Sequence, residues 1–227
     1  MHLTRIMEKE TDLEIFTNKP LEEGFVKEKL RLYRWAIEDY INKDRRFLTA
    51  LKPLEVELDA PGIVREMAQA AKKANVGPMS SVAGSIAGFL GRDLLKIGFR
   101  DVIIENGGDI FLKTTKTLTV GIYSGRSKLW ERLGLKIKPS DTPLGLCTSS
   151  GTIGHSLSFG SADSVVVLSK NAALADAVAT ATCNMVNSKQ EMQKALDFAR
   201  SIKGVLAVVI ILKNNLLSWG RVKFVSR

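Results

Sequence analysis

The sequence has little cysteine, little histidine and no long apolar run. Its only cysteines, Cys147 and Cys183, are too few for a disulfide framework and lack the spacing of a zinc site, so we expect both to be reduced and buried. The most apolar segment, GVLAVVIILKNNLLSW, is interrupted by Lys213 and two asparagines, so we expect no transmembrane helix and no membrane contact. The N-terminal segment MHLTRIMEKETDLEIFTNKP is charged throughout and lacks the apolar core of a signal peptide, which predicts a cytoplasmic protein.

The motifs of several common enzyme families are also absent. The chain contains no GxGxxG, GxxxxGK[ST], GxSxG or HExxH pattern and no pair of CxxC motifs. Dinucleotide-binding, P-loop, esterase and zinc-dependent sites therefore lose most of their support. Internal repeats, low-complexity tracts and Pro-rich linkers are missing as well. With 227 residues, 45% of them hydrophobic, the chain can bury one sizeable core, and we predict a single domain over 1–227.

The charge is strongly basic and unevenly distributed. The net charge is +9, and the excess of positive charge lies after residue 60, where the chain has 22 basic and 11 acidic side chains. Its densest part, 113–138, has only Glu131 against seven cations: Lys113, Lys116, Arg126, Lys128, Arg132, Lys136 and Lys138. Such a field suits the phosphates of a nucleotide or a nucleic acid, but an ordinary solvated basic face has the same composition. No interleaved aromatic residues or nucleic-acid motif accompany it, so the sequence favours the solvated face over a nucleic-acid partner.

Periodicity predicts an α+β fold with helices mostly on one face of a sheet. Residues 3–17 alternate as a hairpin, and 22–50 read as a long helix with Phe25, Leu32, Trp35, Ile37 and Ile41 on its apolar stripe. We interpret this hairpin and helix, about 1–52, as an accessory layer. Further helices are expected from Pro61 to Ala74, from Met79 to Ile97, over 171–186 and over 188–202. Strands are expected at 100–105, 109–113, 117–123, 144–149, 163–169, 204–212, 215–220 and 222–226.

Small residues cover one face of the predicted helix at 79–97. They are Ala83, Gly84, Ala87, Gly88 and Gly91. Because glycine destabilises a helix by about 1 kcal/mol relative to alanine, several glycines together indicate that a backbone, a sheet or a ligand lies close against this face.

Three short segments carry residues able to do chemistry. In ENGGDI at 105–110, the glycines predict a tight turn between two strands, or a place where backbone amides approach a ligand. TSSGTIGH at 148–155 gathers hydroxyls, glycines and His155, which fits a phosphate cradle or an ordinary Ser/Thr-rich turn. His155 is the only candidate imidazole for acid/base work, because His2 lies at the terminus.

ADAVAT at 175–180 is the third segment. Asp176 and Thr180 lie four residues apart on a predicted helix, so a carboxylate and a hydroxyl share one face. Both are oxygen ligands of the kind Mg²⁺ takes, and together they make half of a metal site. The alternative is that Asp176 complements the helix dipole while Thr180 only packs.

These segments, in this order, resemble the ApbE superfamily, whose best-known members are magnesium-dependent flavin transferases. The family pattern is a small-residue helix, a strand leading to a GGD turn, a T/S-S-G segment followed by a histidine, and a strand with an ADALAT-like helix. The matching stretches are GPMSSVAGSIAGFL, VIIENGGDI, TSSGTIGH and SVVVLSKNAALADAVATA, over about 77–186. They are most similar to the small, uncharacterised branch known from archaea and bacteria. The resemblance implies a mostly antiparallel sheet with helices packed on it.

The resemblance also implies the site. Asp176 and Thr180 would ligate Mg²⁺ with a backbone carbonyl near Ser81 or Val82, and His155 and Asp176 would be the catalytic residues. A flavin nucleotide, FAD or FMN, would lie between two walls formed by Gly107, Gly108 and Asp109 and by Thr148, Ser149, Ser150, Gly151 and His155. In known transferases the metal polarises the FAD pyrophosphate, so that a protein threonine attacks and receives FMN.

The chain departs from the family pattern at two points. The lysine and glycine of the family's AKG motif appear here as Ala83 and Gly84, and the DPxTG loop after the histidine is replaced by the shorter SLSFGSAD. Arg126 or Lys128 of the basic segment are candidates to replace the missing charge. We therefore expect Mg²⁺-dependent binding of FAD, FMN or a related nucleotide, with FMN transfer or hydrolysis of the FAD pyrophosphate as candidate activities. The alternative is a non-catalytic flavin carrier. The N-terminal hairpin and helix are a predicted homodimer interface.

Overall fold

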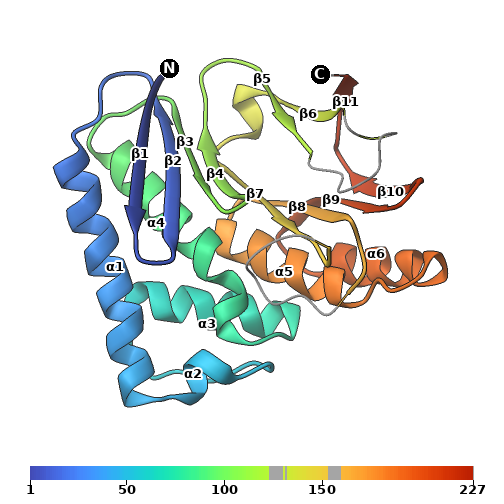
Figure 1. Ribbon diagram of the computed structural model, residues 1–227, viewed down its shortest axis with the longest axis horizontal. Helices are drawn as coiled ribbons and strands as arrows, with labels where there is room; N and C mark the ends of the chain where they lie inside the picture. Colours follow the sequence, from blue (N-terminus) through green and yellow to red (C-terminus); the bar gives the residue numbers. More distant parts are fainter. Residues whose placement is uncertain (123–129, 131, 153–159, 227) are drawn as a thin grey trace.

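The computed structural model describes residues 1–122, 130, 132–152 and 160–226, which form three layers. A large sheet lies in the middle, the helices cover one of its faces, and a small sheet covers part of the other (Figure 1). Every pair of neighbouring strands is antiparallel. The predicted α+β class, a mostly antiparallel sheet with helices packed on it, is therefore confirmed.

The large sheet has eight strands in the order β1-β2-β3-β4-β7-β8-β9-β10. They are β1 (His2–Glu8), β2 (Thr11–Thr17), β3 (Val102–Asn106), β4 (Asp109–Lys113), β7 (Leu144–Ser149), β8 (Ser164–Ser169), β9 (Val205–Leu212) and β10 (Asn215–Gly220). The small sheet has the order β11-β6-β5, from β5 (Leu118–Gly121), β6 (Leu133–Ile137) and β11 (Phe224–Ser226). Strand β6 was not predicted, because its segment LGLKI lies among lysines and was read only as basic sequence.

The helices lie on one face of the large sheet, as predicted (Figure 1). They are α1 (Glu23–Lys43), α2 (Arg46–Thr49), α3 (Gly62–Ala74), α4 (Val82–Lys96), α5 (Ala172–Asn184) and α6 (Met192–Ser201), with 3₁₀ turns η1 (Pro78–Ser81), η3 (Pro139–Asp141) and η4 (Lys189–Glu191). Among the described residues, no helix is long and apolar enough to cross a membrane.

Three apolar clusters hold these layers together. One joins α1, α3 and α4 to β1–β4, and a second joins α3, α5 and α6 to β7–β10. The third fills the space between the two sheets. Burial of apolar surface at about 25 cal/mol per Å² makes these clusters the main source of stability. The functional segments lie where the first two clusters meet.

The first long helix differs from the prediction in its end and in its apolar face. It ends at Lys43 rather than continuing to residue 50, because the Asp44 carboxylate accepts a hydrogen bond from the Arg46 backbone N–H at 3.0 Å and starts a new turn. Its buried residues are Val26, Leu30, Ile37 and Tyr40. Leu32 and Trp35 are 51% and 63% exposed, because they lie on another side of the helix from this stripe.

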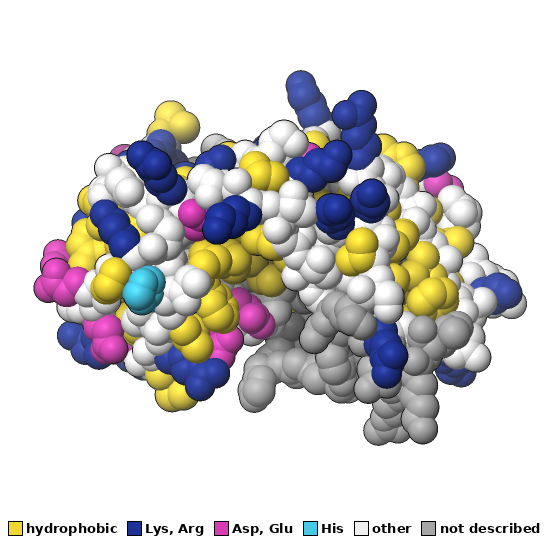
Figure 2. All heavy atoms as spheres, turned by 90° about the horizontal axis from the view of Figure 1, so that it is seen from above, with side chains coloured by type: hydrophobic (Ala, Val, Ile, Leu, Met, Phe, Trp, Pro, Cys, Tyr) yellow, Lys and Arg dark blue, Asp and Glu magenta, His cyan; other side chains and the backbone are white. Residues whose placement is uncertain are grey.

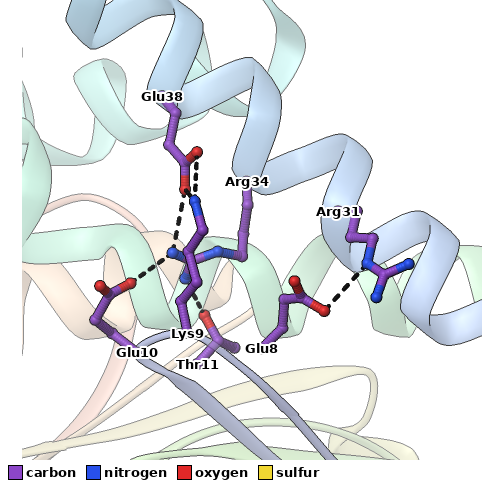
Figure 3. A network of polar contacts seen from close by, with 7 residues as sticks. All are labelled: Glu8, Lys9, Glu10, Thr11, Arg31, Arg34 and Glu38. Carbon is purple, nitrogen blue, oxygen red and sulfur yellow. Dashed lines mark hydrogen bonds and ion pairs between the residues drawn. The ribbon is translucent and has the colours of Figure 1, made fainter.

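The N-terminal hairpin is part of the large sheet. Strand β2 pairs with β3 over five residues, from Leu13–Asn106 to Thr17–Val102. Charged contacts fasten the hairpin tip to α1 (Figure 3). Arg34, with a side chain only 14% exposed, donates to Thr11 Oγ1 at 2.6 Å and also binds Glu10 and Glu38. The hairpin and α1 are therefore held to each other by polar contacts as well as by the apolar cluster beneath them.

Candidate functional site

Three polar side chains lie in one row across β3, β4 and β7. Asn106 is opposite Asp109, and Asp109 is opposite Cys147. Side chains that lie opposite each other on adjacent strands share one face of a sheet. The Asn106 amide reaches α4, and Cys147 belongs to the apolar cluster beneath α5, so the row faces the helices.

A two-residue turn connects the first two members of the row. Gly107 and Gly108 have φ values of 62° and 100°, which non-glycine residues rarely adopt, and this confirms the predicted tight turn. A Cβ atom built on Gly107 would meet no described atom within 4 Å. Within the described part of the chain, this corner of the sheet is therefore uncovered above its glycine backbone.

The beginning of α4 lies against this row. The Asn106 side chain donates a hydrogen bond to the Ala83 carbonyl at 3.2 Å, and the Gly84 backbone N–H donates to Asp176 Oδ2 at 2.8 Å. A Cβ atom on Gly84 would lie 2.6 Å from the Ala172 carbonyl oxygen, so α4 and α5 approach too closely for a side chain there. The small-residue face predicted on this helix is thus explained here by close packing against α5.

Helix α5 contributes the carboxylate of the site. Asn171 caps its N-terminus by accepting a hydrogen bond from the Leu174 N–H at 2.8 Å. Asp176 is buried one turn into the helix, and Thr180, half-buried, follows one turn later. The close fit between β7 and α5 depends on Gly145, whose Cβ atom would lie 2.4 Å from Ala172 Cα.

The segment 148–152 continues from strand β7 rather than forming a separate loop. Thr148 and Ser149 are the last residues of the strand, and Gly151 N–H donates to the Ala162 carbonyl at 2.9 Å. Ser149 lies two residues after Cys147, on the same side of the strand, and its buried hydroxyl has no hydrogen-bond partner among the described atoms. Ser150 Oγ contacts the Thr152 hydroxyl at 3.2 Å. The predicted residue His155 lies outside the described residues.

The structure brings two buried carboxylates, Asp109 and Asp176, close enough to influence each other. Burial raises the pKa of Asp109 to about 7, against hydrogen bonds from Cys147 and the Thr148 N–H that lower it. Burial and then the charge of Asp109 raise the pKa of Asp176 well above its usual range, while the Gly84 N–H opposes this. Burial and both carboxylates raise the pKa of the Cys147 thiol. Two carboxylates that repel each other inside a protein are poised to bind a cation.

The residues present fit a small hard cation. Among the described residues, the buried Asp109 Oδ1 has no hydrogen-bond partner, and no lysine or arginine contributes to the raised pKa of either carboxylate. In the described part of the chain, no three His, Cys, Asp or Glu side chains are arranged to hold a metal. A cation here would therefore take Asp109, Asp176 and the Thr180 hydroxyl with further oxygens from backbone, water or a bound nucleotide.

The sequence placed Asp109 on the nucleotide side, Asn106 only within the ENGGDI turn, and Cys147 only among the reduced, buried thiols. In the structure all three stand in one row, and Asp109 is the neighbour of Asp176. The alternation of the strands was a usable signal for Asn106, since it lies three residues before Asp109 across a two-residue turn. No local signal shows that Cys147 is opposite Asp109, because 37 residues separate the two partners of this pair.

A separate cavity of about 570 Å³ lies between α6 and β10. It is lined by Trp130, Lys189, Met192, Gln193, Asn214, Asn215, Leu216 and Leu217. None of the carboxylates or hydroxyls described above contributes to it, so it is not part of the candidate site.

Comparisons with known sequences place the chain in one family. The family model described as AbpE bacteria matches residues 2–221. The UPF0280 protein MJ1526 of Methanocaldococcus jannaschii is 41% identical over 228 residues, covering 96% of this chain and 90% of that protein. A UPF0280 protein of Methanosarcina acetivorans is 37% identical over 220 residues, covering 96% of this chain and 87% of that protein.

Two of the solved structures that superpose on the chain are named as flavin transferases. The flavin transferase ApbE from Vibrio cholerae superposes with a TM-score of 0.63 at 14% identity and 96% coverage of both chains. The apo form of the flavinyl transferase ApbE of Pseudomonas stutzeri also gives 0.63, at 12% identity, covering 96% of this chain and 93% of that one. At such identities the likeness establishes the fold alone. The chain thus belongs to the AbpE bacteria family, as an uncharacterised branch with the fold of the ApbE flavin transferases.

Proposed function

We propose that this protein binds FAD, or a closely related flavin nucleotide, together with Mg²⁺ at the corner formed by β3, β4, β7, α4 and α5. The observation that carries the proposal is the buried pair Asp109 and Asp176, in which Asp109 Oδ1 has no hydrogen-bond partner within the described part of the chain. Keeping two such carboxylates together is unfavourable unless a cation compensates them. The fold shared with flavin transferases supports the diphosphate of a flavin nucleotide as the other partner of that cation.

The metal would be held by Asp109, Asp176 and Thr180. When bound, Mg²⁺ acts as a Lewis acid that polarises a diphosphate and neutralises its charge. The protein supplies the surrounding positions, and the Gly84 N–H orients Asp176. The buried Ser149 hydroxyl has no hydrogen-bond partner among the described atoms, and no described atom lies near enough to Gly107 to prevent the close approach of a ligand.

Two activities are compatible with such a site. One is transfer of FMN from FAD to an acceptor with release of AMP, and the other is hydrolysis of FAD to FMN and AMP. A non-catalytic flavin carrier is the alternative, and Ala83 favours it. Its position is that of the family's lysine, and here its carbonyl accepts the Asn106 hydrogen bond while its side chain offers no charge.

Isothermal titration calorimetry with FAD, in Mg²⁺ and in EDTA, tests the binding proposal. We expect binding that depends on Mg²⁺ and weakens about 10- to 100-fold in Asp176→Asn and Asp109→Asn, since a hydrogen bond to a charged group contributes about 1.5–3 kcal/mol. Asp197→Asn is the matched control, because this acid is exposed on α6 and pairs with Arg200. Absence of FAD binding by the folded wild type in both buffers would refute the proposal.

Product analysis separates the enzyme from the carrier. The wild type is incubated with FAD and Mg²⁺, FMN and AMP are resolved by chromatography, and the intact masses of candidate acceptor proteins are measured. Free FMN with AMP supports hydrolysis, and AMP with an FMN-sized mass increase supports transfer. Tight binding with neither product supports the carrier.

A further inference from the structure

The small sheet places two lysines opposite each other on adjacent strands. Phe224 pairs with Leu135, and the Lys136 N–H donates to the Lys223 carbonyl at 2.8 Å, so Lys223 is opposite Lys136. Leu135 and Phe224 point into the cluster between the sheets, so the two lysines point to the outer face. Like charges directly opposite on a sheet are destabilising. The sequence favoured a solvated basic face, but it gave no sign of this pairing.

Three more exposed lysines extend the pair into a band. Lys138 lies two residues after Lys136, just beyond the end of β6. Pairing of Leu118 with Ile137 brings Lys116, two residues before Leu118, to the same end of the small sheet. The Lys170 ammonium donates to the Asp141 carbonyl at 2.6 Å in the turn that follows Lys138. We define the lysine band as Lys116, Lys136, Lys138, Lys170 and Lys223.

No acidic side chain forms a salt bridge with this band in the described part of the chain, although Asp101 lies close enough to Lys116 for their charges to attract. The ion pairs found there all involve other cations. The Asp141 carboxylate accepts the Lys138 N–H at 2.9 Å, and the Asp101 carboxylate accepts the Thr115 N–H and hydroxyl, so both are engaged with polar groups. In Figure 2, Lys and Arg side chains gather toward the upper right, whereas most Asp and Glu side chains lie on the side of the N-terminal hairpin.

We propose that the lysine band binds the phosphate backbone of duplex nucleic acid, without preference for base sequence. Neighbouring cations that form no salt bridge within the described chain match closely spaced phosphates, and displacement of counterions provides the driving force. Single strands are disfavoured, because no aromatic side chain belongs to the band as a stacking platform. A membrane is disfavoured, because none of the exposed large hydrophobic residues in the described chain lies within 113–142 or 221–226.

Fluorescence anisotropy with a labelled DNA duplex of about 20 base pairs tests this proposal over a series of salt concentrations. We expect dissociation constants of roughly 10⁻⁴ to 10⁻⁶ M near physiological salt, rising steeply with salt. Lys136→Glu combined with Lys223→Glu should weaken binding about tenfold or more and reduce the salt slope by about 2, one for each lost phosphate contact. If circular dichroism shows that the first double variant is unfolded, Lys136→Gln combined with Lys223→Gln replaces it, because it removes the two charges without reversing them.

The control is Lys194→Glu combined with Lys203→Glu, two exposed lysines on and after α6. This control changes the net charge by the same amount as the Lys136 and Lys223 variant. If the lysine band is the binding surface, the control should weaken DNA binding much less. Equal weakening by both double variants, tighter binding to single-stranded DNA, or binding only to phosphatidylglycerol vesicles would each overturn the proposal. Calorimetry of the band variant with FAD and Mg²⁺ gives an independent readout, because the lysine band shares no residue with the flavin site.

Discussion

Replacing Asp109 by asparagine should stabilise the metal-free protein at alkaline pH and destabilise it slightly at acid pH. In the wild type, the buried carboxyl has its pKa raised from 3.8 to about 7. Below pH 3.8 the carboxyl is neutral in both the folded and the unfolded state, so its burial lowers the free energy of unfolding only slightly. Above that value the unfolded chain releases its proton while the folded chain retains it.

The magnitude follows from this difference of about three pH units. A shift of one unit corresponds to about 1.36 kcal/mol, so the wild type loses about 4 kcal/mol of unfolding free energy as the pH rises from about 4 to above 7. The Asp109→Asn variant has no titrating group at this position and should not show this loss. It also removes the charge that raises the pKa of Asp176. At pH 4 it should cost about 1 kcal/mol, because the amide NH₂ is an added donor in a buried site where the described atoms give Asp109 Oδ1 no hydrogen-bond partner.

The assay is urea unfolding at pH 4.5, 6 and 8 in EDTA, followed by circular dichroism. The difference in unfolding free energy between variant and wild type should change sign, from about 1 kcal/mol destabilising to roughly 3 kcal/mol stabilising. Adding Mg²⁺ at pH 8 should stabilise only the wild type, because ligand binding to the folded state adds to its stability. A difference that stays constant across this pH range would refute the electrostatic account of the site.

Three further substitutions test the packing around the site. Gly145→Ala should destabilise by about 1–3 kcal/mol, because the new methyl group would lie 2.4 Å from Ala172 Cα; the melting temperature reports this as a fall of about 2–4 °C per kcal/mol. Asn106→Ala should cost about 1 kcal/mol in urea unfolding, because it removes the hydrogen bond to the Ala83 carbonyl. Arg34→Met should cost about 1–3 kcal/mol by the same measurement, because it leaves the hairpin tip without its nearly buried guanidinium.

Matched controls distinguish these effects from general sensitivity. Gly24→Ala places its methyl group 3.6 Å from the nearest atom, in a helix, and should be neutral or slightly stabilising. Arg5→Met removes an exposed ion pair with Glu14 and should change stability by less than about 0.5 kcal/mol. Losses in these controls equal to those at the three test positions would contradict the packing explanation.

Local patterns were sufficient for most elements of the fold. The strands around residues 102–113, 144–149 and 205–220 were predicted from alternation or continuous apolar runs, and the helix from Pro61 to Ala74 from its proline and its period. Strand β6 was missed although Leu133, Leu135 and Ile137 alternate, because Lys136 lies between them and Arg132 and Lys138 flank them, so the segment has a basic composition. The end of α1 was predicted too late in the sequence, because the Asp44 carboxylate ends the helix by accepting a hydrogen bond from the Arg46 N–H. The apolar period of a helix gives no sign of such a contact.

The site was predictable only in part, for a physical reason. The spacing of Asp176 and Thr180 is a property of one helix, and the GG turn is a property of one hairpin. The approach of Asp109 to Asp176 is set by strand register and by the contact between α4 and α5, which connect distant segments. Resemblance to a known family supplied the grouping that local spacing could not, and the structure adds that Asp109 lies near Asp176.

The pairing of β2 with β3 has a consequence for how this chain tolerates shortening. Deleting the first 17 residues would leave β3 as an outermost strand, with a line of unsatisfied backbone amides and carbonyls and with Ile104 and Val102 uncovered. Such a strand invites pairing with another molecule and hence aggregation. The hairpin thereby shields the strand that positions Asn106, and an N-terminally trimmed protein would lose solubility before it lost any group of the candidate site.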